Sequence, residues 1–172
     1  MCITNAKPVR LTGPMKVYKV LVLAVDADGR EHTHSPYRTG TRWKTGKRNT
    51  ILPTDESGRY PSLKNAYDNM SHVEEIHCGA FHSFADRGAA EMLAKSLREN
   101  MDYLFTLYAI PASDRKVVIS ECVVPEDSAY VFEGDFDVTV RILPYGKALV
   151  MPRKSVASSS LILERILEDD EK

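Results

Sequence analysis

The segment from Val17 to Val25 constrains the fold more strongly than any other part of this chain. It is a nearly continuous apolar run, rich in β-branched side chains. Such a run is typical of a strand that is buried on both faces. The Asp28-Gly29 pair that follows is a strong signal for a tight hairpin turn. The sequence therefore predicts a buried strand that returns through a second strand over residues 30–37.

Further apolar runs predict more strands and one amphipathic helix. In the segment 86–100, Ala89, Ala90, Leu93 and Leu97 recur at helical spacing, and Asp86 can cap the start. The segment 160–167 fits either a strand or a short helix. Other strand-like runs lie at residues 73–84, 103–110, 117–124, 129–132, 138–143 and 148–151. We expect an α+β fold, a mostly antiparallel, curved sheet with one main helix packed on it.

The length of 172 residues fits a single domain that spans residues 1–172. Prolines and a glycine within residues 1–14 predict an irregular arm there. Residues 38–70 are polar and rich in Gly, Pro, Thr and Asn, so we expect a long functional loop with one short strand around Arg42. Residues 168–172 form an acidic tail.

Composition indicates a soluble, intracellular protein. Hydrophobic residues make up 43% of the chain and charged residues 27%, and no apolar run approaches the roughly 20 residues that cross a bilayer. The opening residues lack the pattern of a signal peptide. The three cysteines are widely spaced, which argues against disulfides and structural zinc. We therefore expect a cytoplasmic protein with no membrane partner and no cofactor.

Two histidines flank a glycine just before the predicted helix, and they are candidate catalytic residues. A histidine can give or take a proton near neutral pH, so His77 and His82 could act as base and acid in phosphodiester hydrolysis. They share a site if the strand bends between them, for which Gly79 is suited, or if His82 lies beyond the end of the strand, in the turn that enters the helix, where free N–H groups favour an anion. The alternative is a packed core histidine that bonds to backbone.

A basic and aromatic segment over residues 37–48 suggests a local anion site in a chain of net charge −1. Duplex nucleic acid would need a broader positive surface. The candidate ligand-binding residues are cations for phosphate and rings for base stacking, namely Arg38, Arg42, Lys44, Tyr37 and Trp43. A solvated hairpin explains the same composition. The glycine spacing of a P-loop or a Rossmann turn is missing.

Three further features allow a functional and a structural interpretation, and a fourth, Cys122, has a structural one alone. Cys2 becomes an N-terminal nucleophile if Met1 is removed, or it is incidental. Cys122 is expected in the core. His32 and His34 point the same way on a strand and could bind a metal, but we favour a solvent-facing edge. Ser158-Ser159-Ser160 could bind an anion, but we favour a polar connection.

Several short strings spread over most of the chain resemble a family of small phage and bacterial proteins, most of which have no assigned role. They are Met1-Cys2, Val17–Leu21, Ser35-Pro36-Tyr37, Gly79–Phe84, Cys122–Pro125 and Ala157-Ser158. The resemblance implies a small accessory protein, encoded by a phage. By analogy, such a counter-defence protein binds or degrades the nucleotide signals of bacterial immunity.

Together these patterns predict a protein of the cytoplasm, the host's if phage-encoded, that binds and hydrolyses a nucleotide or cyclic-nucleotide ligand without a metal. His82 and His77 would exchange the protons. Three alternatives stay open, which are a sponge that binds the ligand without cleaving it, an enzyme with Cys2 as its nucleophile, and a protein-interaction module. A homo-oligomer is also open, because pockets in small proteins often form between subunits.

Overall fold

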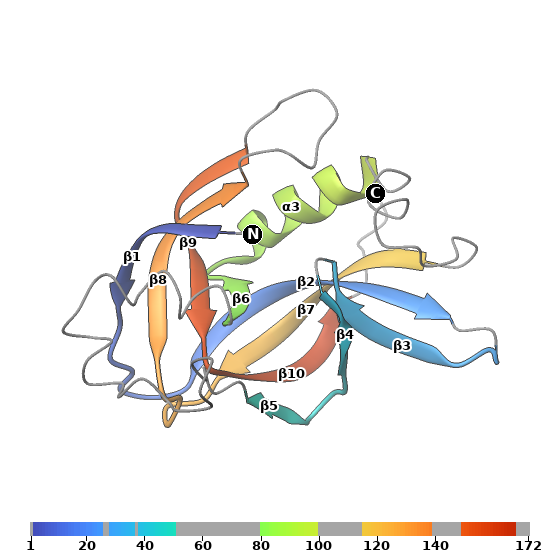
Figure 1. Cartoon of the computed structure of the whole chain (residues 1–172), viewed down its shortest axis with the longest axis horizontal. Coiled ribbons are helices and arrows are strands. Elements are labelled where there is room, and N and C mark those ends of the chain that lie inside the picture. Colours follow the sequence, from blue (N-terminus) through green and yellow to red (C-terminus); the bar gives the residue numbers. More distant parts are fainter. Residues whose placement is uncertain are drawn as a thin grey trace, which may run out of the picture.

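The computed structural model describes residues 2–25, 28–36, 38–50, 80–99, 115–138 and 149–167. The strands in these ranges form a ten-stranded sheet (Figure 1). The elements are β1 (Cys2–Pro8), β2 (Met15–Val25), β3 (Glu31–Ser35), β4 (Arg38–Trp43), β5 (Arg48–Thr50), β6 (Phe81–Phe84), α3 (Arg87–Glu99), β7 (Arg115–Val124), β8 (Val131–Val138), β9 (Leu149–Ser158) and β10 (Ser160–Leu167).

The main path of the sheet has the order β1-β8-β9-β6-β2-β7-β10-β5, and β3 joins it through β2 while β4 pairs with β3. The ladders between these strands are antiparallel. With α3 packed on it, the sheet makes a sheet-dominated α+β fold. The sequence prediction of a mostly antiparallel sheet with a helix is confirmed at that level.

Strand β2 lies at the centre of the sheet, as its apolar run predicted. One edge pairs with β7 from Met15 to Ala24. The opposite edge is shared, because Tyr18 pairs with β6 and Val22 with β3. Residues 19–22 are buried in succession, and alternate side chains of a strand face opposite sides. Both faces of β2 are therefore covered.

Helix α3 covers one of these faces. Asp86 caps its start, since one carboxylate oxygen accepts a hydrogen bond of 2.8 Å from the backbone N–H of Ala89. The predicted helical spacing holds, and the buried side chains of α3 pack against β2, β6 and β7. We call this set the helix-side core, which consists of Val20, Phe84, Ala89, Ala90, Leu93, Ala94, Leu97, Val117 and Ile119.

The opposite face of β2 belongs to a second cluster, which a bend in the chain helps to enclose. Strands β9 and β10 are separated only by Ser159, yet β9 pairs with β6 and β10 pairs with β7. The chain thus turns a corner and reaches both sides of β2 (Figure 1). We call the enclosed set the inner core, which consists of Val17, Leu21, Trp43, Phe81, Val118, Cys122, Val124, Val131, Val156, Leu161 and Leu163.

The expected irregular arm at residues 1–14 is wrong for its first half. Residues 2–8 form β1, which pairs with β8 through a register shift between Thr4 and Lys7. Ile3 and Ala6 are buried against Tyr130 and Phe132, and this burial outweighs the prolines and the glycine of the segment. Pro8 stands at the end of the strand, where a missing N–H is tolerated.

The expected long loop at residues 38–70 is also corrected in part. Residues 38–43 form β4 and residues 48–50 form β5, while residues 51–70 lie outside the described residues. The predicted strand at 103–110 and most of that at 138–143 lie outside them too. The segment 160–167 is a strand, β10. Within the described ranges, no helix is both long and apolar enough to span a membrane.

Candidate functional site

Two histidines of β3 and one arginine of β7 lie on the face of the sheet that carries α3. Along one row His34 pairs with Val22, which pairs with Val117; along the next, His32 pairs with Ala24, which pairs with Arg115. Directly opposite residues of an antiparallel ladder share a face. Val117 belongs to the helix-side core, so His32, His34 and Arg115 face the same side. We call these three residues the histidine–arginine cluster.

In this cluster His34 is buried, and His32 and Arg115 are half-buried. His34 is only 3% exposed, and His32 is half-buried with its ring centroid 5.9 Å from that of His34. Small Ala24 stands between His32 and Arg115 in the register, which leaves room above β2 for the long arginine side chain. The expectation that the two histidines form a solvent-facing hairpin edge is therefore wrong, because β4 pairs with the outer edge of β3 and the side chain of His34 is buried.

Hydrogen bonding fixes which nitrogen of His34 carries hydrogen. Its Nδ1 lies 3.1 Å from the carbonyl oxygen of Ser35. Because a carbonyl oxygen only accepts, Nδ1 donates, and Nε2 of the neutral ring is left as an acceptor. Nε2 is buried and has no hydrogen-bond partner among the described residues, and the same holds for Nδ1 of His32. A buried nitrogen in this state is costly unless something bonds to it.

Burial and positive neighbours keep His34 uncharged near neutral pH. Burial is the main cause that lowers the pKa of His34, and the nearby His32 and Arg115 lower it further, against an opposing effect of the bond to Ser35. Burial also lowers the pKa of Arg115, but an arginine stays charged at any physiological pH. The cluster thus joins a fixed positive charge to a neutral imidazole.

Strand β4 places two predicted ligand-binding positions beside this cluster. In the β3–β4 ladder, position Arg42 lies opposite His34 and position Arg38 opposite Ser35. The side chains of these two arginines are not among those described, and Tyr37 lies outside the described residues. Lys44 is exposed at the end of β4. The backbone therefore brings the basic segment to the edge that carries the histidines.

Trp43 is separated from that edge, contrary to its predicted role as a base-stacking ring. It pairs with Thr33 and so faces the opposite side of the sheet from His34. Its ring is 4% exposed, packs edge-on against Phe81 at 5.0 Å, and lies 5.1 Å from the ammonium of Lys19. Trp43 is a core residue in this structure, so it offers no open face for a base.

His82 lies on the same face as the cluster, at the same edge of β2. It is half-buried on β6, two residues from Phe84 of the helix-side core. Strands β6 and β3 pair with the same edge of β2, β6 at Tyr18 through Phe84 and β3 at Val22 through His34. Because β6 runs antiparallel to β2, going back along β6 from Phe84 to His82 leads toward His34. Its carbonyl accepts a 2.6 Å hydrogen bond from Nζ of Lys19. His77 lies outside the described residues, so their pairing stays a prediction.

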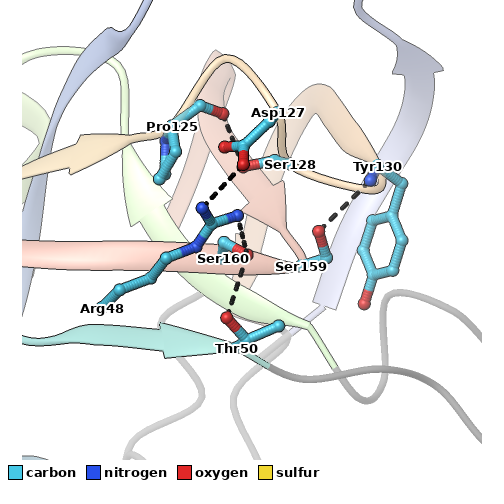
Figure 2. Close-up of polar contacts among 8 residues, drawn as sticks. All are labelled: Arg48, Thr50, Pro125, Asp127, Ser128, Tyr130, Ser159 and Ser160. Atoms are coloured by element: carbon cyan, nitrogen blue, oxygen red, sulfur yellow. Dashed lines mark hydrogen bonds and ion pairs between the residues drawn. The ribbon is translucent and has the colours of Figure 1, made fainter.

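The triple serine is a structural corner, as favoured from the sequence. Its hydroxyl groups are buried and engaged: that of Ser158 donates to the carbonyl of Ser160, that of Ser159 accepts from the N–H of Tyr130, and that of Ser160 accepts from Arg48. Figure 2 shows Arg48 of β5 bridging Ser160, the first residue of β10, to Asp127 in the connection between β7 and β8. We call Ser158, Ser159 and Ser160 the serine corner.

The cysteines give no active thiol within the described side chains. Cys122 is fully buried, and burial raises the pKa of its thiol to about 11, so the predicted core role is confirmed. Cys2 lies on β1 opposite Asp137, and its side chain is not among those described. Strand β1 stands at one end of the strand order, away from β2 and β3. The described residues also contain no group of three or more His, Cys, Asp or Glu that could hold a metal ion.

The main residue that the sequence reasoning missed is Arg115. The strand was expected to begin at residue 117, whereas β7 begins at Arg115, and only the pairing through Ala24 shows that it joins the histidines. Comparisons of the chain with protein-family models, with curated proteins and with solved structures found no match. The geometry of the cluster is therefore what supports a function.

Proposed function

We propose that this protein binds a small phosphate-bearing ligand of the nucleotide class at the histidine–arginine cluster. The observation that carries the proposal is the buried Nε2 of His34, which has no hydrogen-bond partner among the described residues and lies close to Arg115. Buried polar atoms in folded proteins are nearly always bonded. A guanidinium matches the paired oxygens of a phosphate, so a phosphate group suits this setting better than an uncharged one.

The basic segment of β4 supports the same ligand class. Arg42 and Arg38 stand at ladder positions opposite His34 and Ser35, so two more cations belong to the edge where the histidines lie. The proposed partners of the ligand are then His32, His34 and Arg115, with Arg42, whose position lies directly opposite His34, as a further phosphate contact. Arg38 pairs with Ser35 beyond a register shift in the ladder, so its contact with the ligand stays a prediction. Tyr37 is retained as the proposed stacking ring, and Trp43 is not.

Cleavage of a phosphodiester is the second candidate function, and the paired imidazoles favour it. The neutral Nε2 of His34 can take the proton from an attacking hydroxyl as the new phosphorus–oxygen bond forms. His32, with its ring 5.9 Å away, can give a proton to the leaving oxygen as the old bond breaks. Arg115 would offset the charge that develops on the phosphate. In this account His34 and His32 replace the predicted pair His82 and His77 as the proton carriers.

The resemblance to small phage proteins supplies the biological setting of the proposal. A phage counter-defence protein would meet its ligand in the host cytoplasm, where cyclic nucleotides and ADP-ribose derivatives are the immune signals. We propose that class of ligand first, and the experiment below includes it.

Incubation with a panel of cyclic dinucleotides, cyclic trinucleotides and ADP-ribose derivatives tests the proposal. The mixtures are analysed by liquid chromatography and mass spectrometry before and after heat denaturation of the protein. A ligand that leaves solution and returns intact supports binding alone, and new product masses support cleavage. If every compound stays free and unchanged, the nucleotide proposal is wrong, and an interaction module or a Cys2 enzyme becomes the better account.

A further inference from the structure

The hydrogen-bonding state of His34 creates a conflict with an anionic ligand. Nδ1 already donates to the carbonyl of Ser35, so Nε2 of the neutral ring offers only a lone pair. The oxygens of a phosphodiester or a sulfate are also acceptors. Two acceptors cannot bond to one another, so contact between Nε2 and such an oxygen requires a proton between them.

The surroundings of His34 decide when that proton can bind. Val22 of β2 and Val117 of β7 are its apolar neighbours in the row. The charged groups that act on it within the described residues are His32 on β3 and Arg115 on β7, both basic. From α3, Arg98 donates to the carbonyl of Val117, and position Arg42 on β4 lies opposite. A proton on His34 is therefore opposed by burial and by positive neighbours until an anion arrives.

We propose that the site takes up its anionic ligand together with one proton, which comes from solvent and binds Nε2 of His34. The inference rests on the proposed binding function and adds its regulation. It applies to binding without cleavage, because a protonated Nε2 cannot act as the base of the second candidate function. The new N–H then donates a charge-assisted hydrogen bond to a ligand oxygen, and the anion offsets the charges of Arg115 and of the protonated ring. By linkage, the affinity for the anion rises as the pH falls toward the pKa of His34.

Titration of the histidine ring signals by nuclear magnetic resonance tests this coupling, with sodium sulfate as the probe. Sulfate has the shape of phosphate and does not itself titrate near neutral pH. We expect sulfate to raise the pKa of His34 by about one unit or more, and sodium chloride at equal ionic strength to leave it nearly unchanged. The Arg115→Gln variant should lose most of the sulfate effect. The Arg165→Gln variant, which removes an exposed arginine paired with Glu121, should keep it.

A pKa of His34 that does not respond to sulfate, or responds equally to chloride, overturns the inference. An equal response in Arg115→Gln also overturns it, because the cluster would then not be the binding site. The two proposals fail separately. If no nucleotide binds but sulfate raises the pKa of His34, the ligand class is wrong and the coupling stands. If a nucleotide binds and the pKa of His34 stays the same in the complex, the coupling is wrong and the binding function stands.

Discussion

The serine corner and the histidine–arginine cluster are both buried and polar, but they differ in how their polar atoms are satisfied. At the serine corner each hydroxyl has a partner within the chain, as Figure 2 shows for Ser159 and Ser160. In the histidine–arginine cluster Nε2 of His34 and Nδ1 of His32 have none among the described residues. Satisfied polar groups stabilise a particular fold, whereas buried nitrogen atoms without partners cost stability.

This difference in hydrogen bonding distinguishes a structural polar group from a candidate binding site within the same sheet. The serine corner holds the β9–β10 bend, on which the enclosure of the inner core depends. The histidine–arginine cluster leaves Nδ1 of His32 and Nε2 of His34 without a hydrogen-bond partner among the described residues. We infer that the first is retained for folding and the second for a ligand, and the changes below test that division.

The largest effect is expected from the loss of Trp43. It tests the division between folding and ligand-binding residues, because the sequence predicted that this ring binds the ligand. Trp43→Ala should lower the free energy of unfolding by about 3–5 kcal/mol, measured by denaturant titration, because it empties part of the inner core. Trp43→Phe keeps an aromatic ring there and should bind ligand like the wild type. A stable Trp43→Phe protein that no longer binds would return Trp43 to the site.

A smaller loss is expected at the serine corner. Ser159→Ala removes the acceptor of the buried N–H of Tyr130, which should lower the free energy of unfolding by about 1–3 kcal/mol and leave ligand affinity unchanged. Ser128→Ala is the control, because the hydroxyl of Ser128 is only part-buried and donates to the carbonyl of Pro125. Weakened ligand binding at unchanged stability in Ser159→Ala would break the division.

The smallest expected effect is a gradual change of the free energy of unfolding with pH, which His34 causes. The folded protein holds the pKa of His34 below its ordinary value of 6.5, so below that value the unfolded chain binds the proton more readily. The contribution of the neutral His34 to the free energy of unfolding is fully present above pH 6.5. It is lost as the pH falls from 6.5 through the lowered pKa of His34, by at most about 1.4 kcal/mol per pH unit. His34→Gln should flatten that part of the stability curve, and an unchanged curve would show that His34 is not buried as described.

The outline of the fold could be predicted from the sequence because it follows from local patterns. The apolar run of β2, the helical spacing of α3 and the burial of Cys122 are all properties of neighbouring residues. Strand β1 could not be predicted, since Ile3 and Ala6 are buried only through contacts with Tyr130 and Phe132, which are distant in the sequence.

The candidate site could be predicted only in its residue types. The sequence pointed to histidines with arginines, and Arg42 does lie opposite a histidine. The partner is His34, however, because pairing across β3 and β4 decides which residues meet, and a register cannot be read from separate segments. The same limit hid Arg115, whose place beside the histidines depends on two successive ladders.

The most direct test of the binding site is the affinity of Arg115→Gln for the panel compound that denaturation releases intact, measured by calorimetry against wild type and Arg165→Gln. The account predicts that Arg115→Gln binds about 10–100-fold more weakly, as the loss of one charged hydrogen-bonding partner implies, with a stability close to that of the wild type. It predicts that Arg165→Gln binds like the wild type. Equal affinity in all three proteins would contradict the assignment of the histidine–arginine cluster as the ligand site.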